Sequence, residues 1–157
     1  MIRLRTFLLA FGLPLAALAH DVGLSTATVR LKTDLVQTEL TAYLRGAPGA
    51  FDVVLSADTL VYFGPLDEVV SAAAAALRPG GLLIFTVEEL RNADAGTDYA
   101  IAPHGRYSHT ERYVHRVLAG AGLHPTIAAA ELRMEAGEPV HGLLIRAARM
   151  AEGASHA

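Results

Sequence analysis

Residue types that can do chemistry gather after two apolar runs of the chain. Asp58 follows the run at 51–56, and Glu88 and Glu89 follow the run at 82–87. A polar and aromatic loop comes next and contains His104, Arg106, Tyr107 and His109. Histidine can take up a proton near neutral pH, and arginine can hold a carboxylate or phosphate through two hydrogen bonds. These residues are therefore candidate binding or catalytic groups, and ordinary loop packing is the alternative for the four in the loop.

The two apolar runs indicate the framework that positions these groups. Each is a nearly continuous stretch of β-branched, aromatic and leucine side chains, typical of strands buried on both faces of a parallel sheet. Residues 66–78 between them are predicted to be a helix, because Pro65 suits a first turn and Asp67 and Glu68 complement the helix dipole. Glycines at 80 and 81 end that helix. We expect parallel neighbouring strands joined by a crossover helix.

The C-terminal part of the chain carries a different pattern. Residues 108–122 are predicted to be a helix in which Ser108 and Glu111 form a capping box. The segments 126–134 and 140–148 are strand candidates, and the turn between them is too short to hold a crossover helix. These two strands should therefore pair as an antiparallel hairpin.

Composition excludes several classes of function. The chain has 157 residues, which favours one domain, and a net charge of -3 with no block of Lys or Arg. There is no electrostatic signal for nucleic acid or for an anionic membrane surface. The absence of cysteine excludes disulfides, thiolate metal sites and cysteine nucleophiles. No metal site is predicted.

The first nineteen residues resemble a secretory signal. Two arginines precede an apolar stretch over 6–18, and a small-x-small pattern at 17–19 offers a cleavage site. The apolar stretch is too short for a permanent membrane anchor. A buried helix is the alternative, but Gly12 and Pro14 interrupt it. A periplasmic or secreted location is expected if this segment is genuine.

The residues between this signal and the apolar runs contain two further strand candidates. Residues 20–33 contain an alternating strand candidate and are interpreted as a short strand and linker of separate origin. Residues 35–40 are a short strand candidate, and 41–45 a helical turn or two. The last residues, 151–157, are expected to be a disordered tail.

Three motifs make the chain similar to a known family. The run over 51–64, the Leu-Arg-Pro-Gly-Gly turn beginning at Leu77, and the Pro-His-Gly-Arg-Tyr segment beginning at Pro103 resemble class I S-adenosylmethionine-dependent methyltransferases of the small-molecule type (methyltransferase types 11 and 12). The resemblance implies an α/β fold for residues 34–150. It is a partial Rossmann-like methyltransferase sheet with parallel strands, crossover helices and an antiparallel C-terminal hairpin. A small-molecule acceptor and a cytoplasmic location are typical of the family.

The resemblance also implies roles for individual residues. In this family S-adenosylmethionine lies across the carboxyl ends of the parallel strands. Glu39 matches the position near the adenine, unless it is a solvated surface residue. The positions beside the methionine moiety are Ala57, Asp58, Thr59 and Leu60, although Asp58 could instead start a helix. Glu88 and Glu89 would face the substrate, and the catalytic candidates are the loop residues His104, Arg106, Tyr107 and His109.

One departure from the family limits this reading. The glycine-rich βα unit that cradles the cofactor, written D/E-x-G-x-G-x-G, has no counterpart before Leu35. The resemblance therefore covers the C-terminal half of the domain, and a half-sheet would expose an edge open to self-association. Three hypotheses stay open: a truncated methyltransferase domain, active or inactive, an exported binding module, and a chimera joined near residues 32–34.

Overall fold

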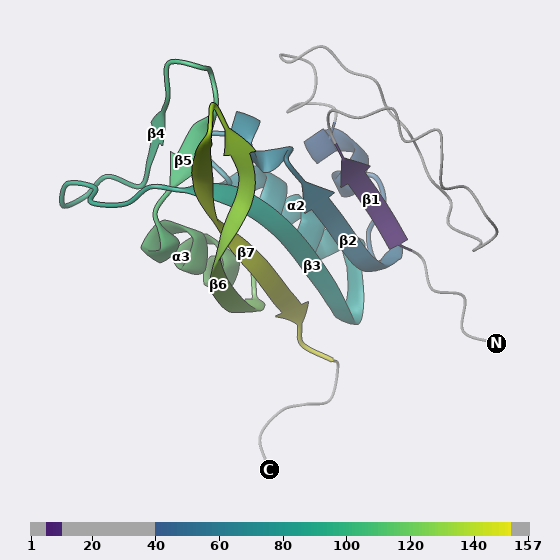
Figure 1. Ribbon diagram of the computed structural model, residues 1–157. Coiled ribbons are helices and arrows are strands. Elements are labelled where there is room, and N and C mark those ends of the chain that lie inside the picture. Colours follow the sequence, from purple (N-terminus) through teal and green to yellow (C-terminus); the bar gives the residue numbers. More distant parts are fainter. Residues whose placement is uncertain (1–5, 11–39, 152–157) are drawn as a thin grey trace, which may run out of the picture.

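The computed structural model describes residues 6–10 and 40–151 (Figure 1). The seven described strands form one mixed sheet, and their bounds are β1 Thr6–Ala10, β2 Phe51–Ala57, β3 Leu77–Glu89, β4 Tyr99–Ile101, β5 Tyr107–His109, β6 Leu123–Glu135 and β7 Glu138–Arg149. The helices are residues 40–45, the 3-10 helix η1 Leu60–Tyr62, α2 Asp67–Ala76 and α3 Glu111–Gly120. None of these helices is both long and apolar enough to cross a bilayer.

The parallel pair expected from the apolar runs is confirmed. β2 and β3 pair in parallel from Val53 with Leu82 to Ser56 with Phe85, and α2 connects them. The helix ends at Ala76, two residues earlier than predicted, because Leu77 already pairs with Phe51. The chain then passes through a register shift before the regular ladder begins.

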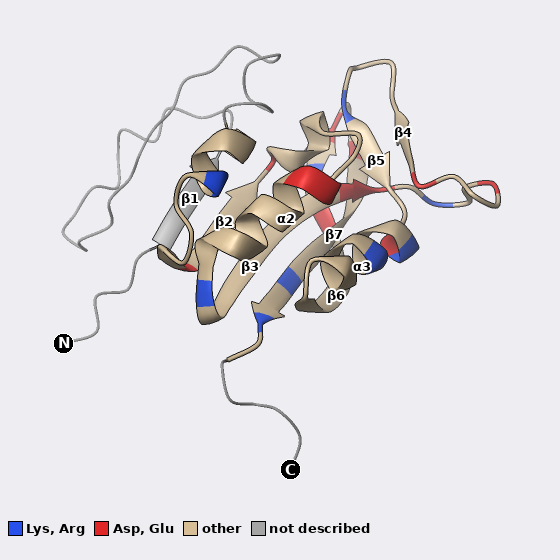
Figure 2. Cartoon of the chain, turned by 180° about the vertical axis from the view of Figure 1, so that it is seen from behind, with Lys and Arg blue, Asp and Glu red and all other residues tan. Residues whose placement is uncertain are grey.

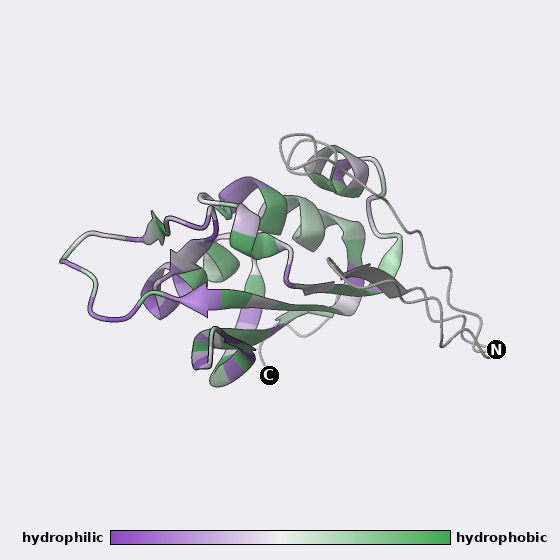
Figure 3. Cartoon of the chain, turned by 45° about the horizontal axis from the view of Figure 1, so that its top comes forward, coloured by the Kyte–Doolittle hydropathy of each residue, from purple (hydrophilic) through white to green (hydrophobic). Residues whose placement is uncertain are grey.

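The described helices α2 and α3 lie on one face of the sheet (Figures 2 and 3). The core lies between them and the sheet, where Phe85 of β3 and Ile145 of β7 are buried with Leu118 of α3. The other face of β3 carries Leu82 and Ile84, and both are only half-buried. We expected these strands to be buried on both faces. Among the described residues, β3 is fully buried only on the face that packs against the helices.

The C-terminal hairpin is also confirmed. β6 and β7 pair antiparallel from Leu123 with Arg149 to Glu135 with Glu138, and β6 begins three residues nearer the N-terminus than predicted. Ala136 and Gly137 form the turn with φ of 51° and 86°, the left-handed pair that suits the twist of a two-residue hairpin. β7 in turn pairs antiparallel with β3, on the side away from β2.

The start of α3 differs from the prediction. Ser108 belongs to β5 and pairs with Glu88 of β3, so it is not a helix cap. The N-cap is Thr110, whose hydroxyl oxygen accepts a hydrogen bond from the backbone N–H of Tyr113 at 3.3 Å. A three-residue strand that precedes a helix directly leaves too short a pattern to recognise in the sequence.

The edge of β2 that was expected to be exposed is covered. Residues 6–10, predicted to lie outside the fold as part of an export signal, form β1 and pair in parallel with β2 from Thr6 with Val53 to Ala10 with Ala57. Pairing satisfies backbone groups that a free edge would leave open. The expectations for 20–33 and 35–39, and for the tail beyond 151, fall outside the described residues.

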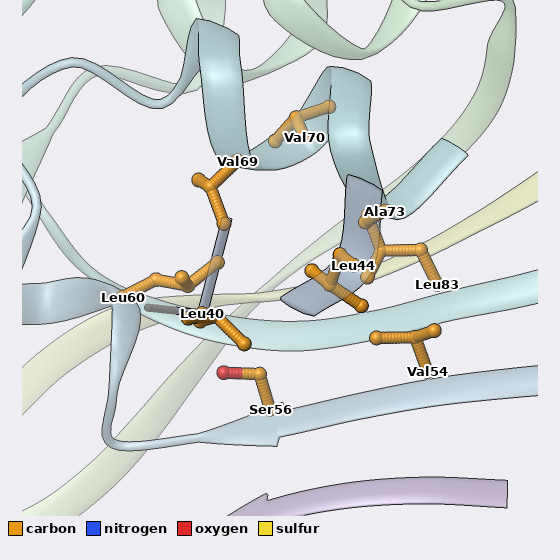
Figure 4. Close-up of a pocket in the computed structure, with 9 residues that line it drawn as sticks. All are labelled: Leu40, Leu44, Val54, Ser56, Leu60, Val69, Val70, Ala73 and Leu83. Atoms are coloured by element: carbon orange, nitrogen blue, oxygen red, sulfur yellow. The ribbon is translucent and has the colours of Figure 1, made fainter. Parts of the chain in front are cut away.

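A small cavity lies in the helix-side core (Figure 4). Its volume is about 20 Å³, enough for one water molecule. Leu40, Leu60 and Val70 contribute to its apolar wall, and the buried hydroxyl of Ser56 at its edge has no hydrogen-bond partner among the described residues. The cavity is too small and too apolar for a substrate, so the candidate site must be sought elsewhere.

Candidate functional site

Four charged side chains form a closed ring at the carboxyl end of β3. Glu88 Oε1 lies 2.5 Å from Nη2 of Arg133 and 3.2 Å from Nε of Arg106. Glu135 joins the same two arginines, at 2.6 Å from Arg106 Nη2 and 3.0 Å from Arg133 Nη2. We call Glu88, Arg106, Arg133 and Glu135 the charged ring. Its two positive and two negative charges balance.

Three parts of the fold bring the ring together. Glu88 is held between Ser108 of β5 on one side and Gly142 of β7 on the other. The hairpin continues past this point, so its far end projects beyond β3 (Figure 1). A register shift in β6 between Glu131 and Arg133 bends that end. Arg133 and Glu135 thereby lie beside the end of β3.

The interactions within the ring stabilise its charged forms. Burial works against the charged form of Arg133, but hydrogen bonds to Glu88 and Glu135 outweigh it and raise the pKa of the guanidinium. The hydrogen bond from Arg133 lowers the pKa of Glu135, and the charge of Arg106 acts in the same direction. Both groups are therefore ionised at neutral pH.

Asp58 lies beside the ring, at the end of β2. Its carboxylate Oδ1 is 3.5 Å from Nη1 of Arg133, and its side chain is 43% exposed. Its backbone has φ of 53°, an uncommon conformation for a residue other than glycine, and its N–H contacts the hydroxyl of Thr86 at 3.4 Å. Asp58 does not cap a helix, because the N-cap of η1 is Thr59.

The other predicted cofactor positions have different surroundings. Ala57 is exposed at the end of β2. Thr59 is buried, with its hydroxyl donating to the carbonyl of Ala57 at 3.1 Å, and Leu60 is buried in the wall of the cavity. Only Ala57 and Asp58 of this group are therefore open to a ligand in the structure, and Glu39 lies outside the described residues.

The predicted substrate and loop residues divide into two groups. Glu88 is in the charged ring, whereas Glu89 forms an ion pair with Arg91 at 2.6 Å. Arg106 is also in the ring, and the exposed His104 lies next to it, with Nδ1 accepting from the backbone N–H of Arg106 at 3.4 Å. His109, with Tyr107, lies in a separate aromatic cluster.

His109 is buried within that aromatic cluster. Its Nε2 is 2.8 Å from the carbonyl oxygen of Gly64, and its ring stacks on Tyr113 at a centroid distance of 5.9 Å. Tyr99 contacts His109, Tyr107 and Tyr113. Any Cβ at residue 64 would come within 2.9 Å of the Tyr107 ring, so glycine there permits the close packing. His109 therefore ties β5 to the segment that follows η1.

Acid should weaken this packing. Burial lowers the pKa of His109, although hydrogen bonds to the backbone at Gly64 and Phe63 work in the opposite direction. Above about pH 6.5 the imidazole is neutral in both states and its stabilising effect is complete. As pH falls below that value the unfolded chain takes up the proton first, so stability declines by at most about 1.4 kcal/mol per pH unit until the folded-state pKa is reached.

We therefore predict that His109→Gln flattens the dependence of stability on pH below about pH 6.5. Urea unfolding at several pH values measures this slope. The exposed His104 provides the matched control, and His104→Gln should leave the slope unchanged. An identical slope in wild type and His109→Gln would contradict the burial argument.

Arg133 and Glu135 were missed by reasoning from the sequence. They lie on or beside a segment that was interpreted only as a strand. A signal was available, because a hairpin whose second strand runs antiparallel to β3 must place its turn near the carboxyl end of β3. Charged residues next to that turn were therefore candidates for the same edge.

The architecture is an α/β fold with a mixed sheet, and comparisons place it among Rossmann-like methyltransferase folds. Residues 15–85 match the family described as "Methyltransferase domain". The match begins inside the segment predicted to be an export signal and includes residues 20–33. A comparison with curated proteins gave no match.

Many solved structures share the fold, and two of them illustrate it. One is a SAM-dependent methyltransferase from Methanosarcina mazei, with 17% identity and a TM-score of 0.51 over 67% of this chain and 62% of that one. The other is described as "Conversion of a Disulfide Bond into a Thioacetal Group during Echinomycin Biosynthesis", with 18% identity and a TM-score of 0.52 over 77% and 63%. The chain thus spans less than two thirds of either structure. These likenesses show the fold, and the family match over residues 15–85 covers less than half of the chain.

Proposed function

We propose that the chain transfers a methyl group from S-adenosylmethionine to a small-molecule acceptor. The observation that carries the proposal is the position of the charged residues. Asp58 and Glu88 end two adjacent parallel strands, at the edge where open α/β sheets bind their ligands. The match to the methyltransferase family over residues 15–85 supports the choice of cofactor.

The described residues suit part of the cofactor. Ala57 and the half-exposed Asp58 would lie against its methionine moiety, and Glu39, outside the described residues, is proposed for the adenine region. The cofactor supplies a methyl group on a positively charged sulfur, so transfer depends mainly on alignment of the acceptor. Asp58 offers a carboxylate at the edge, and the exposed His104 can receive a proton released by the acceptor.

Binding of S-adenosylhomocysteine, the product form of the cofactor, tests the proposal directly. Isothermal titration calorimetry on the full chain should give a dissociation constant in the micromolar range, typical of a functional ligand site. Asp58→Asn should weaken binding if the carboxylate contacts the ligand, whereas Asp94→Asn, an exposed residue in the loop after β3, should not. Absence of heat at millimolar ligand would reject the proposal, and would agree with a truncated, inactive domain.

Two alternatives from the sequence, an exported binding module and a chimera, are tested at the amino-terminal segment. Export and incorporation of β1 into the sheet are mutually exclusive, because removal of residues 1–19 removes Thr6–Ala10. Intact-mass measurement of the expressed protein decides between them. The mass of a chain that begins at Met1 would support β1 as part of the domain. The mass of a chain that begins at His20, found in a periplasmic extract, would support an exported module. The DNA sequence upstream of codon 34 tests the chimera hypothesis. If that DNA encodes a glycine-rich loop, in frame or frameshifted, the chimera hypothesis is supported.

A further inference from the structure

The carboxylate of Glu135 lies in a site built by two arginines. Its Oε2 is 2.5 Å from Nη2 of Arg106 and 3.0 Å from Nη2 of Arg133, and Nε of Arg133 also donates to it at 3.2 Å. Its Oε1 accepts from Nη2 of Arg106 at 2.6 Å. Paired guanidinium groups favour carboxylate and phosphate ligands, because their planar donors match two oxygens at once.

The arginines are better enclosed than the carboxylate they bind. The side chains of Arg106 and Arg133 are 17% and 24% exposed, and Glu88, at 8%, contacts both. The side chain of Glu135 is 43% exposed and adjoins the hairpin turn. Glu88 therefore holds the two guanidinium groups in place, while Glu135 approaches them from the open side.

The far end of the hairpin has few other attachments. The ladder between β3 and β7 ends where Glu88 pairs with Gly142. Beyond that point β6 and β7 form ladder hydrogen bonds with each other and with no other described strand. Ion pairs from Arg133 and Glu135 hold this end against the rest of the described sheet. The pairs made by Glu135, whose side chain is 43% exposed, contribute about 0–1 kcal/mol each, so another anion can compete with Glu135.

We propose that Arg106 and Arg133 form a clamp for a carboxylate or phosphate group of a small ligand, and that Glu135 is an internal substitute which the ligand displaces. The proposal rests on the proposed function only for the ligand's source: the anionic group belongs to the methyl acceptor or is the carboxylate of S-adenosylmethionine. Displacement of Glu135 would leave the arginines with Glu88 and the more distant Asp58. A ligand anion would restore the missing charge.

Anion binding without cofactor tests the clamp. Inorganic phosphate is titrated into the full chain at low salt, and Glu135→Ala should bind it about tenfold more tightly than wild type because the competing carboxylate is gone. Glu135→Gln, which keeps the size of the side chain, should show a gain in the same direction. Glu138→Gln is the matched control, because it removes the same charge from the other side of the turn and should change nothing.

The clamp residues supply the decisive variants. In Glu135→Ala combined with Arg133→Gln or Arg106→Gln, the gain in phosphate affinity should disappear. If phosphate affinity still rises in both combined variants, or rises equally in Glu138→Gln, the cause would be general surface charge. Either result would overturn the proposal. So would equal phosphate affinity in wild type and Glu135→Ala.

Binding of two nucleosides shows whether the anionic group belongs to the cofactor or to the acceptor. S-adenosylhomocysteine carries a carboxylate, and 5′-methylthioadenosine lacks it. If Glu135→Ala tightens binding of the first but not the second, the clamp binds the carboxylate of the cofactor. If only phosphate binding improves, the clamp binds the acceptor. Because the phosphate titration needs no cofactor, failure of nucleoside binding would reject the methyltransferase proposal and leave the clamp intact.

Discussion

Replacement of Gly142 by alanine is expected to lower the free energy of unfolding by about 3 kcal/mol, because the new methyl group has no space. A Cβ at this position would lie 2.3 Å from Cδ1 of Leu132 and 2.5 Å from the carbonyl oxygen of Val87. The leucine can shift, but the carbonyl belongs to the backbone of β3 and cannot move without breaking the ladder to β7. Chemical denaturation of the purified variant measures the loss.

A second glycine provides the control. Gly120 ends α3, and a Cβ there would have no atom within 4 Å. Gly120→Ala should therefore leave stability unchanged or raise it by up to about 1 kcal/mol, since alanine is the better helix former. Equal effects at the two positions would contradict the packing of Leu132 over Gly142.

Glu88→Gln is expected to cost about 2–3 kcal/mol, because it removes the buried charge that two arginines share. Glutamine keeps the shape of the side chain but presents an amide N–H₂ group toward guanidinium donors. Arg106 and Arg133 would then depend on Glu135 alone in the ring. The loss should appear as a lower denaturation midpoint with an unchanged dependence on denaturant concentration.

An exposed ion pair tests whether burial causes this effect. Glu68 contacts Arg45 at 3.0 Å, but its side chain is 78% exposed. Glu68→Gln should change stability by less than about 1 kcal/mol. A loss at Glu68 as large as that at Glu88 would show that enclosure of the ring contributes little.

The sequence predicted the elements whose patterns are long and regular. The runs at 51–56 and 82–87 predicted the parallel pair, and the short connection between 126–134 and 140–148 predicted the hairpin. The helix that begins at Asp67 followed from its charged first turn. Each of these conclusions used signals contained within short stretches of the chain.

The sequence failed where the outcome depends on distant partners. An apolar five-residue stretch is compatible with an export signal or with a strand. Thr6–Ala10 forms a strand by pairing with β2, and this contact between distant parts of the chain cannot be recognised from the local pattern. Among the predicted site residues, Asp58, Glu88 and Arg106 lie at one edge of the sheet, but His109 lies in the aromatic cluster. Arg133 completes the edge from 45 residues beyond Glu88, and only the bend in β6 brings it there.

The central position of β3 affects how the chain folds during synthesis on the ribosome. Its partner on the β2 side is already made when β3 emerges, but the residues of β7 that pair with it follow 54 to 66 positions later, from Gly142 opposite Glu88 to Ala148 opposite Leu82. At about 5–20 residues per second the nascent chain therefore presents an unsatisfied strand for roughly 3–13 s. Chaperones that bind extended apolar segments would meet β3 in that interval.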